Sequence, residues 1–185
     1  MTLPSLKTLG LSAVALAATA LVSTAQIERL DLPKMIAKTD NTVVGEIVAK
    51  KVFRVDHPVD GPELYYTTIT VRGRSLVNDQ LLHAEVTYPG GFISPEEGVY
   101  NSEAPTEDET RLGNEVVVFY FWNDDMGGDV AGNMLQASHG GIYRVAKTLQ
   151  GQVVLGKGDG YALSKNWKLT ALDQEVTRLD DQLKK

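Results

Sequence analysis

The feature that most constrains the fold is an uninterrupted run of strand-forming residues in the second half of the chain. A turn at Gly113 and Asn114 precedes seven consecutive β-branched or aromatic residues at positions 116–122. Such residues favour strands because their side chains pack well on a pleated surface. A continuous apolar run of this length is typical of a strand that is covered on both faces. We therefore expect residues 115–122 to form a central strand of the core.

The first 25 residues have the layout of a secretory signal peptide. One basic residue, Lys7, precedes an uncharged apolar stretch at residues 9–22, and small residues follow at 23–25. The apolar stretch has 14 residues, fewer than the roughly 20 that a membrane-spanning helix needs. We therefore predict cleavage after Ala25 and a periplasmic or secreted protein without stable membrane insertion. An uncleaved N-terminal membrane anchor is the alternative.

Composition excludes several classes of function. The chain of 185 residues has no cysteine, which excludes zinc–thiolate sites, iron–sulfur sites and cysteine nucleophiles. The exported part is long enough to bury a core without disulfides. The net charge of −6 repels phosphate backbones, so no nucleic-acid partner is expected. The sequence does not identify a partner; another exported protein is a candidate.

The exported part is organised as short strands separated by turns. Gly45 lies inside the first strand and predicts a bulge or sharp bend there. Residues 54–63 and the acidic residues 92–110 are expected to be loops, and residues 123–132 a glycine-rich turn. Strands are expected at residues 42–53, 64–72, 81–88, 115–122, 134–137, 142–147 and 152–155.

Helices are expected only near the two ends of the exported part. Asp31 can cap a short helix at residues 31–39, with Pro33 in its first turn. A second helix is expected at about residues 170–184, with Thr170 and Asp173 as a capping box. Its single apolar stripe favours packing on the strands over presentation to a partner. The stripe consists of Leu169, Leu172, Val176, Leu179 and Leu183.

Together these patterns predict a mainly β fold. We expect a small antiparallel OB-like barrel of five to seven strands, with a short N-terminal helix and an amphipathic C-terminal helix. The predicted organisation is a signal peptide at residues 1–25, the barrel at 26–160, and a linker with the C-terminal helix, packed on the barrel, at 161–185.

Six segments, in this order, resemble a broad family of exported bacterial OB-like domains, mostly of unassigned function. They are TVVGEI at 42–47, YTTITV at 66–71, VTYPGG at 86–91, AP at 104–105, LGNEVVVF at 112–119 and GGIYRV at 140–145. The family is distantly similar to the netrin-like domain of metalloproteinase inhibitors. Those inhibitors chelate the target's zinc through an N-terminal cysteine, which this chain lacks. The family's usual Lys-Gly pair after the second strand is also missing, because Gly73-Arg74-Ser75-Leu76 stands there.

A search for catalytic patterns finds none. The three histidines, His57, His83 and His139, lack the HxH or HExxH spacing of zinc sites. His139 precedes two glycines at a turn, and it is the strongest candidate for a functional role among the three histidines. No Gly-x-Ser-x-Gly elbow is present. The stretch at residues 156–160 contains glycines around Lys157 but lacks the ending of a phosphate-binding loop, so we expect a flexible turn.

One turn carries oxygen ligands of the kind that calcium prefers. Asp124, Asp125 and Asp129 follow Asn123 in the glycine-rich turn. Their spacing does not fit an EF-hand, which needs alternating acidic positions and a glutamate at the twelfth. A solvated turn is the alternative interpretation, so these three aspartates are weak candidates for metal binding.

The function expected from the sequence is a non-enzymatic, exported binding or interaction domain without a cofactor. Two alternatives stay open: an exported hydrolase with a carboxylate and histidine site in residues 92–110, 123–132 and 139–141, and a calcium-stabilised envelope protein. The candidate binding surface consists of Pro89, Gly90, Gly91, Glu96, Glu97 and His139.

Overall fold

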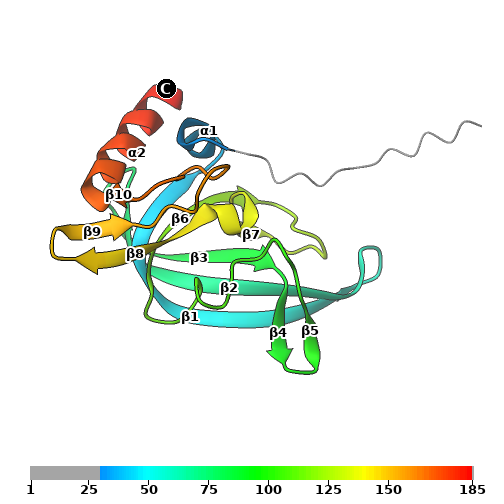
Figure 1. The fold of residues 1–185 in the computed structure, drawn as a ribbon. Coiled ribbons are helices and arrows are strands. Elements are labelled where there is room, and N and C mark those ends of the chain that lie inside the picture. Colours follow the sequence, from blue (N-terminus) through cyan, green and yellow to red (C-terminus); the bar gives the residue numbers. More distant parts are fainter. Residues whose placement is uncertain (1–29, 185) are drawn as a thin grey trace, which may run out of the picture.

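The computed structural model describes residues 30–184, so the predicted signal peptide and its cleavage site lie outside the described part. Strands dominate this part, with one helix near each end (Figure 1). No helix within these residues is long and apolar enough to cross a membrane. In chain order the elements are α1 (Leu32–Ala37), β1 (Asn41–His57), β2 (Gly61–Ser75), β3 (Leu81–Pro89), β4 (Gly91–Ser94), β5 (Glu97–Val99), β6 (Glu115–Asn123), β7 (Gly132–Leu135), η1 (Ser138–Gly141), β8 (Ile142–Thr148), β9 (Gly151–Val154), β10 (Trp167–Lys168) and α2 (Leu169–Leu183).

Five strands close into a barrel. β1 pairs with β2, β2 with β3, β3 with β7, β7 with β6, and β6 returns to β1. These pairings are antiparallel except for that of β3 with β7, which is parallel and joins Thr87 to Met134. β8, β9 and β10 extend the sheet beyond β6. The predicted mainly β fold, a small barrel with a short helix near its start and a C-terminal helix, is confirmed.

β6 is the strand around which the barrel is built. One of its edges pairs with β1, and the other pairs with β8 near its start and with β7 near its end. Five consecutive residues of β6 are buried. Because successive side chains point to opposite faces of a sheet, Val116, Val118 and Tyr120 join one core cluster, and Val117 and Phe119 join another. β6 is therefore covered on both faces, as its sequence predicts.

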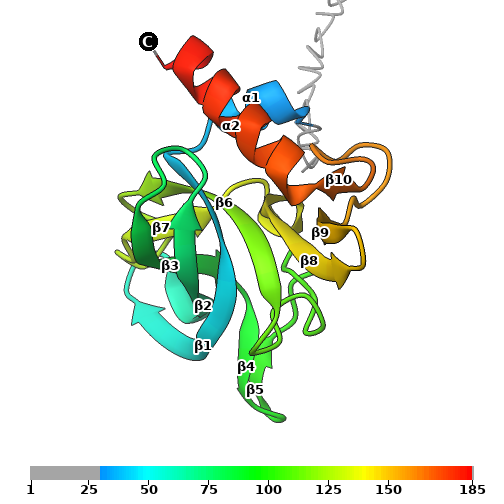
Figure 2. The ribbon, with the colours of Figure 1, turned by 90° about the vertical axis from the view of Figure 1, so that its left-hand side faces the viewer.

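The two helices form a second layer against the outside of the barrel (Figure 2). α1 begins as predicted: the side chain of Asp31 accepts a hydrogen bond of 2.9 Å from the backbone N–H of Lys34. The stripe of α2 packs within the molecule, since its first four members are buried and only Leu183 is half-exposed. α1, α2 and the outward side of β6 thus share one apolar cluster.

The predicted capping box of the C-terminal helix is wrong. Lys168 occupies the cap position and no side chain caps the helix. Asp173 instead forms an ion pair with Arg74 of β2, and this hydrogen-bonded pair raises the pKa of Arg74. A charged partner on a neighbouring strand therefore replaces the local cap and ties α2 to the barrel.

Two segments predicted as loops contain strands. β1 and β2 continue toward each other until His57 pairs with Gly61, which leaves a three-residue turn between them. The guanidinium of Arg54 bonds both Asp56 and Glu63 across this extension. In the acidic segment at 92–110, β4 and β5 form a separate two-stranded hairpin.

Two glycines let β1 and β2 approach closely where the barrel bends. Gly45 lies directly opposite Gly73 in the ladder. A Cβ atom at Gly45 would overlap the carbonyl oxygen of Arg72, and one at Gly73 would overlap that of Val44. A register shift follows after Ile47, so the bend or bulge predicted from Gly45 is present in β1.

Substitution of Gly45 by alanine should destabilise the barrel by about 2–3 kcal/mol, because the new methyl group meets backbone that cannot move aside. The matched control is Gly113→Ala, in a turn with positive φ but open space around the added methyl group. Its expected cost is about 1 kcal/mol, from left-handed backbone strain alone. Urea unfolding measures the loss in free energy of unfolding for both variants. Equal losses would contradict the close approach of the β1 and β2 backbones at Gly45.

Leu172→Ala should cost about 3 kcal/mol, because Leu172 is fully buried between α2 and the barrel. Leu183→Ala, at the last position of the same stripe and half-exposed, should change stability by less than about 0.5 kcal/mol. Thermal and urea unfolding of the two variants provide the comparison. Two equally small effects would mean that the stripe of α2 does not stabilise the isolated molecule.

Candidate functional site

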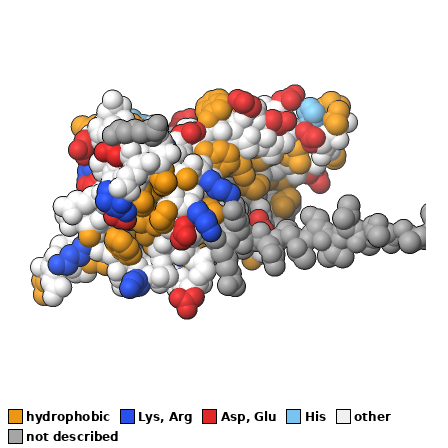
Figure 3. Space-filling model, turned by 90° about the horizontal axis from the view of Figure 1, so that it is seen from above, with side chains coloured by type: hydrophobic (Ala, Val, Ile, Leu, Met, Phe, Trp, Pro, Cys, Tyr) orange, Lys and Arg blue, Asp and Glu red, His pale blue; other side chains and the backbone are white. Residues whose placement is uncertain are grey.

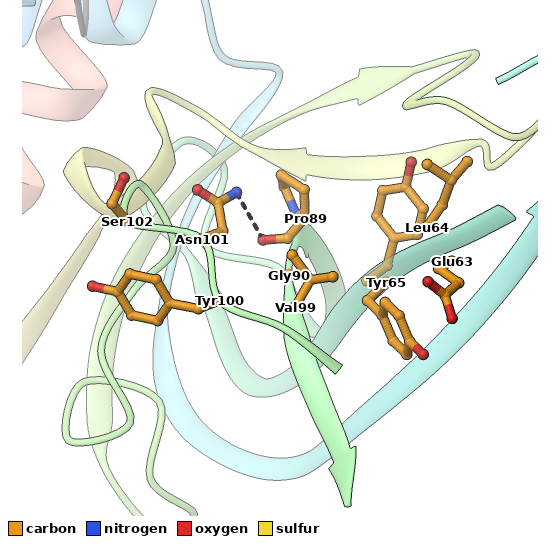
Figure 4. A pocket seen from close by; sticks show the side chains of 10 residues that line it. Glu63, Leu64, Tyr65, Pro89, Gly90, Val99, Tyr100, Asn101 and Ser102 are labelled. Carbon is orange, nitrogen blue, oxygen red and sulfur yellow. Dashed lines mark hydrogen bonds between the residues drawn. The ribbon is translucent and has the colours of Figure 1, made fainter. Parts of the chain in front are cut away.

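The β4–β5 hairpin and the segment after it separate two pockets. The first pocket, of about 330 Å³, lies between residues 63–66 of β2 and residues 99–102, with Pro89 and Gly90 completing its lining (Figure 4). The second, of about 210 Å³, shares residues 99–102 and continues to residues 104–107. Residues 99–102 therefore form a wall with a pocket on each side.

The turn beneath this wall is held firmly. The N–H of Gly90 donates to the carbonyl oxygen of Tyr65 at 2.7 Å, and the Thr67 hydroxyl donates to the carbonyl oxygen of Gly90 at 2.6 Å. The side-chain amide of Asn101 donates to the carbonyl oxygen of Pro89 at 3.3 Å (Figure 4). Gly91 has positive φ and no room for a side chain beside Thr67. The three residues of this turn, predicted as part of a binding surface, thus line the pockets on a fixed backbone.

Large apolar side chains are exposed around these pockets. Tyr100 is 80 % exposed although it lines both of them. Phe92 and Val99, also exposed, line the second pocket, and Phe92 reaches a third, open pocket of about 560 Å³ together with exposed Leu112. Neighbouring exposed apolar side chains of this kind mark sites of interaction. From the side of the helices, in contrast, charged side chains of both signs lie among the apolar ones (Figure 3).

Acidic side chains border the pockets. Glu97, in the hairpin, lies 4.0 Å from Arg54 of β1. Glu96 accepts a hydrogen bond of 3.3 Å from the Ser94 hydroxyl at the hairpin turn. Glu63 lines the first pocket and Glu107 the second. These carboxylates are solvated, so their ion pairs and hydrogen bonds contribute little to stability.

His139 lies elsewhere and lines neither pocket. Its Nδ1 is 3.1 Å from the carbonyl oxygen of Glu103, and its Nε2 is 2.8 Å from the Tyr161 hydroxyl. Its backbone N–H also donates to Glu103 at 2.9 Å. These contacts give His139 a structural role: it connects the acidic segment to the loop that contains Tyr161.

A mostly buried ion pair fastens the same acidic segment to the loop between β9 and β10. Lys157 pairs with Glu109 and donates to the carbonyl oxygen of His139. Its ammonium group lies 5.5 Å from the centre of the Tyr143 ring and 5.8 Å from that of Tyr161. Both charged side chains are largely shielded from solvent. The pair was not recognisable in the sequence, where Lys157 stands among glycines that predict a flexible turn.

Burial and hydrogen bonding oppose each other in this pair. Burial lowers the pKa of Lys157 in spite of the neighbouring carboxylate. Burial alone would raise the pKa of Glu109, but hydrogen bonds from Lys157 and Thr106 bring it below its ordinary value of 4.5. The contribution of Glu109 to stability is therefore present above about pH 4.5 and is lost as the pH falls through its lowered pKa.

Glu109→Gln should destabilise the protein by about 2 kcal/mol at pH 7, because it leaves the Lys157 ammonium largely buried without its counter-charge. The loss should shrink as the pH rises toward 10.5, the ordinary pKa of lysine, since Lys157 then loses its proton. Adding Lys157→Met should restore most of the stability, because no unpaired charge remains. Urea unfolding at pH 7 and pH 10 tests this. A double variant less stable than Glu109→Gln would contradict it.

The candidate calcium ligands face different partners. Asp124 accepts a hydrogen bond of 2.7 Å from the indole N–H of Trp122. Asp125 accepts one of 2.8 Å from the backbone N–H of Gly127, and Asp129 lies 3.3 Å from His57. Within residues 30–184, no three histidine, aspartate or glutamate side chains come together in a way that could hold a metal ion. The geometry therefore gives the calcium interpretation no support.

A hydrolase site in the ranges expected from the sequence would use three groups, Glu96 with Glu97, Asp124 with Asp125, and His139, and these groups are dispersed. The contacts of Glu96 and Glu97 lie at the hairpin and at β1, those of Asp124 and Asp125 lie in their own turn, and those of His139 lie near Tyr161. No hydrogen bond or ion pair among the described residues joins one of these three groups to another. A hydrolytic site built from them has no geometric support.

Comparison of the chain with protein-family models, curated proteins and solved structures finds no match. The resemblance to exported OB-like domains therefore stays a prediction. The pockets beside β4–β5 and the exposed side chain of Tyr100 are the features of the structure that indicate a function. Sequence reasoning missed Tyr100, because a single tyrosine in an acidic segment does not differ from an ordinary surface residue until its neighbours are known.

Proposed function

We propose that the protein is an exported, non-enzymatic binding module, and that it holds a segment of another exported protein in the pockets beside β4–β5. The exposure of Tyr100 between two pockets carries the proposal. The layout of the first 25 residues supports export. The turn formed by Pro89, Gly90 and Gly91, which the sequence had suggested as a binding surface, supplies the base of the site.

The chemistry of the pockets favours a polypeptide ligand. Tyrosine offers a large, stiff apolar surface and a hydroxyl group, and it is enriched among residues that dominate binding energies. Asn101, Ser102 and Glu63 place polar groups at the edge of the first pocket, as in interfaces where a polar rim surrounds an apolar centre. Because the turn below is held by hydrogen bonds, little backbone conformational entropy would be lost on binding.

A library of displayed dodecapeptides, selected on the full chain, should enrich a common sequence, and Tyr100→Ala should weaken binding of the synthetic peptide at least about tenfold. The matched control is Leu149→Ala, which removes an exposed apolar side chain at the β8–β9 turn and should leave affinity unchanged. Fluorescence anisotropy measures both affinities. The proposal fails if no sequence is enriched, or if the two substitutions have the same effect.

A further inference from the structure

β1 has a long edge that no strand covers. It pairs with β2 along almost its whole length, but its pairing with β6 ends where Glu46 meets Glu115. Ile47 is the last residue bonded on that side, through backbone hydrogen bonds with Gly113 and Asn114. Beyond it, residues 48–57 have no second strand partner among the described residues. One edge of β1 therefore presents unpaired backbone groups over ten residues.

An uncovered edge of this length is a template for another strand. Extended peptides bind to such edges by main-chain hydrogen bonds, and neighbouring pockets receive alternate side chains. Here the third pocket lies directly beside the edge: Lys50 and Val52 of β1 line it together with residues 107 and 110–112 and Phe92. Val52, Phe92 and Leu112 give it an apolar part that suits one large apolar side chain of an added strand, and Lys50, Glu107, Thr110 and Arg111 supply polar groups around that part.

The charge along the edge indicates the composition of that strand. Residues 48–57 carry three basic side chains, Lys50, Lys51 and Arg54, against the single acidic side chain of Asp56, in a chain whose net charge is −6. Lys50 bonds Glu107, and Arg54 bonds Asp56, whereas Lys51 is exposed and has no charged partner among residues 30–184. Lysines on an edge discourage pairing with like-charged strands, and opposite charges across a strand pair are favourable.

We infer that residues 48–57 of β1 take up an extended acidic segment of a partner protein as an additional strand, with one large apolar side chain in the third pocket. The inference rests on the proposed binding function and names the mode of binding. The second pocket shares Phe92 and Glu107 with the third, so a strand on β1 and the contacts around Tyr100 can belong to one continuous ligand.

Amide hydrogen exchange measured by NMR on the full chain tests the assignment, with the most enriched dodecapeptide as the probe. Binding should slow exchange at least tenfold at alternate amides within residues 48–57. Residues 41–46 serve as an internal control, because they are already paired with β6 and should not change. The enriched peptide should contain acidic residues flanking a large apolar one.

A charge exchange provides the second readout. Lys51→Glu should weaken binding of the acidic peptide about fivefold, and a peptide with its acidic residues replaced by lysine should regain that affinity on the variant. Lys147→Glu, at an exposed lysine of β8, is the matched control and should have no effect. Circular dichroism should show both variants folded, since both side chains are exposed.

The possible results separate the two proposals. Binding that depends on Tyr100 but leaves the β1 amides unprotected overturns the edge assignment alone. Protection of β1 by a peptide that is insensitive to Tyr100→Ala supports the edge and removes the pockets around Tyr100 as the site. Protection that appears without peptide as protein concentration rises assigns the edge to a second copy and overturns the peptide assignment. Absence of any enriched peptide overturns both.

Discussion

The pairing of β6 with the first part of β1 is the contact on which the rest of the molecule depends. It closes the five-stranded barrel, and the other edge of β6 holds β7 and β8. The same pairing ends at Glu46, where the turn at Gly113 and Asn114 leads the chain away from β1. One register therefore produces both a closed barrel and an open edge. Closure protects the backbone groups of a sheet, whereas the remainder of β1 keeps one row of them available.

The surface proposed for binding combines a fixed frame with exposed side chains. Hydrogen bonds from Thr67 and Asn101 hold the turn below the β4–β5 hairpin. Further along the same irregular segment, Glu109 is anchored by Lys157 of the loop between β9 and β10. Tyr100 lies between these two attachments and is largely exposed. Ordering its backbone before a ligand arrives lowers the entropy cost of binding.

Several elements were predictable because their determinants lie close together in the chain. The β-branched and aromatic run of β6, the Asp31 cap of α1, and the β8–β9 hairpin each follow from local pattern. The apolar stripe of α2 also identified its buried face. The bend in β1 was indicated by Gly45, although the reason for it, the facing Gly73, is 28 positions away in the chain.

The sequence by itself thus determined the main strands, the helix at each end and the buried faces of β6 and α2, because periodicity and propensity act within a few residues. Tertiary structure decided the rest. Asp173 pairs with Arg74 of β2 instead of capping its own helix, and Lys157 becomes a mostly buried partner of Glu109 instead of part of a free turn. Tyr100 is a candidate contact because the fold places a pocket on each side of it. The second half of β1 has an open edge because its pairing with β6 ends at Glu46, and a pocket lies beside that edge. Charges and exposed side chains take their roles from neighbours distant in sequence, and no local pattern encodes those neighbours.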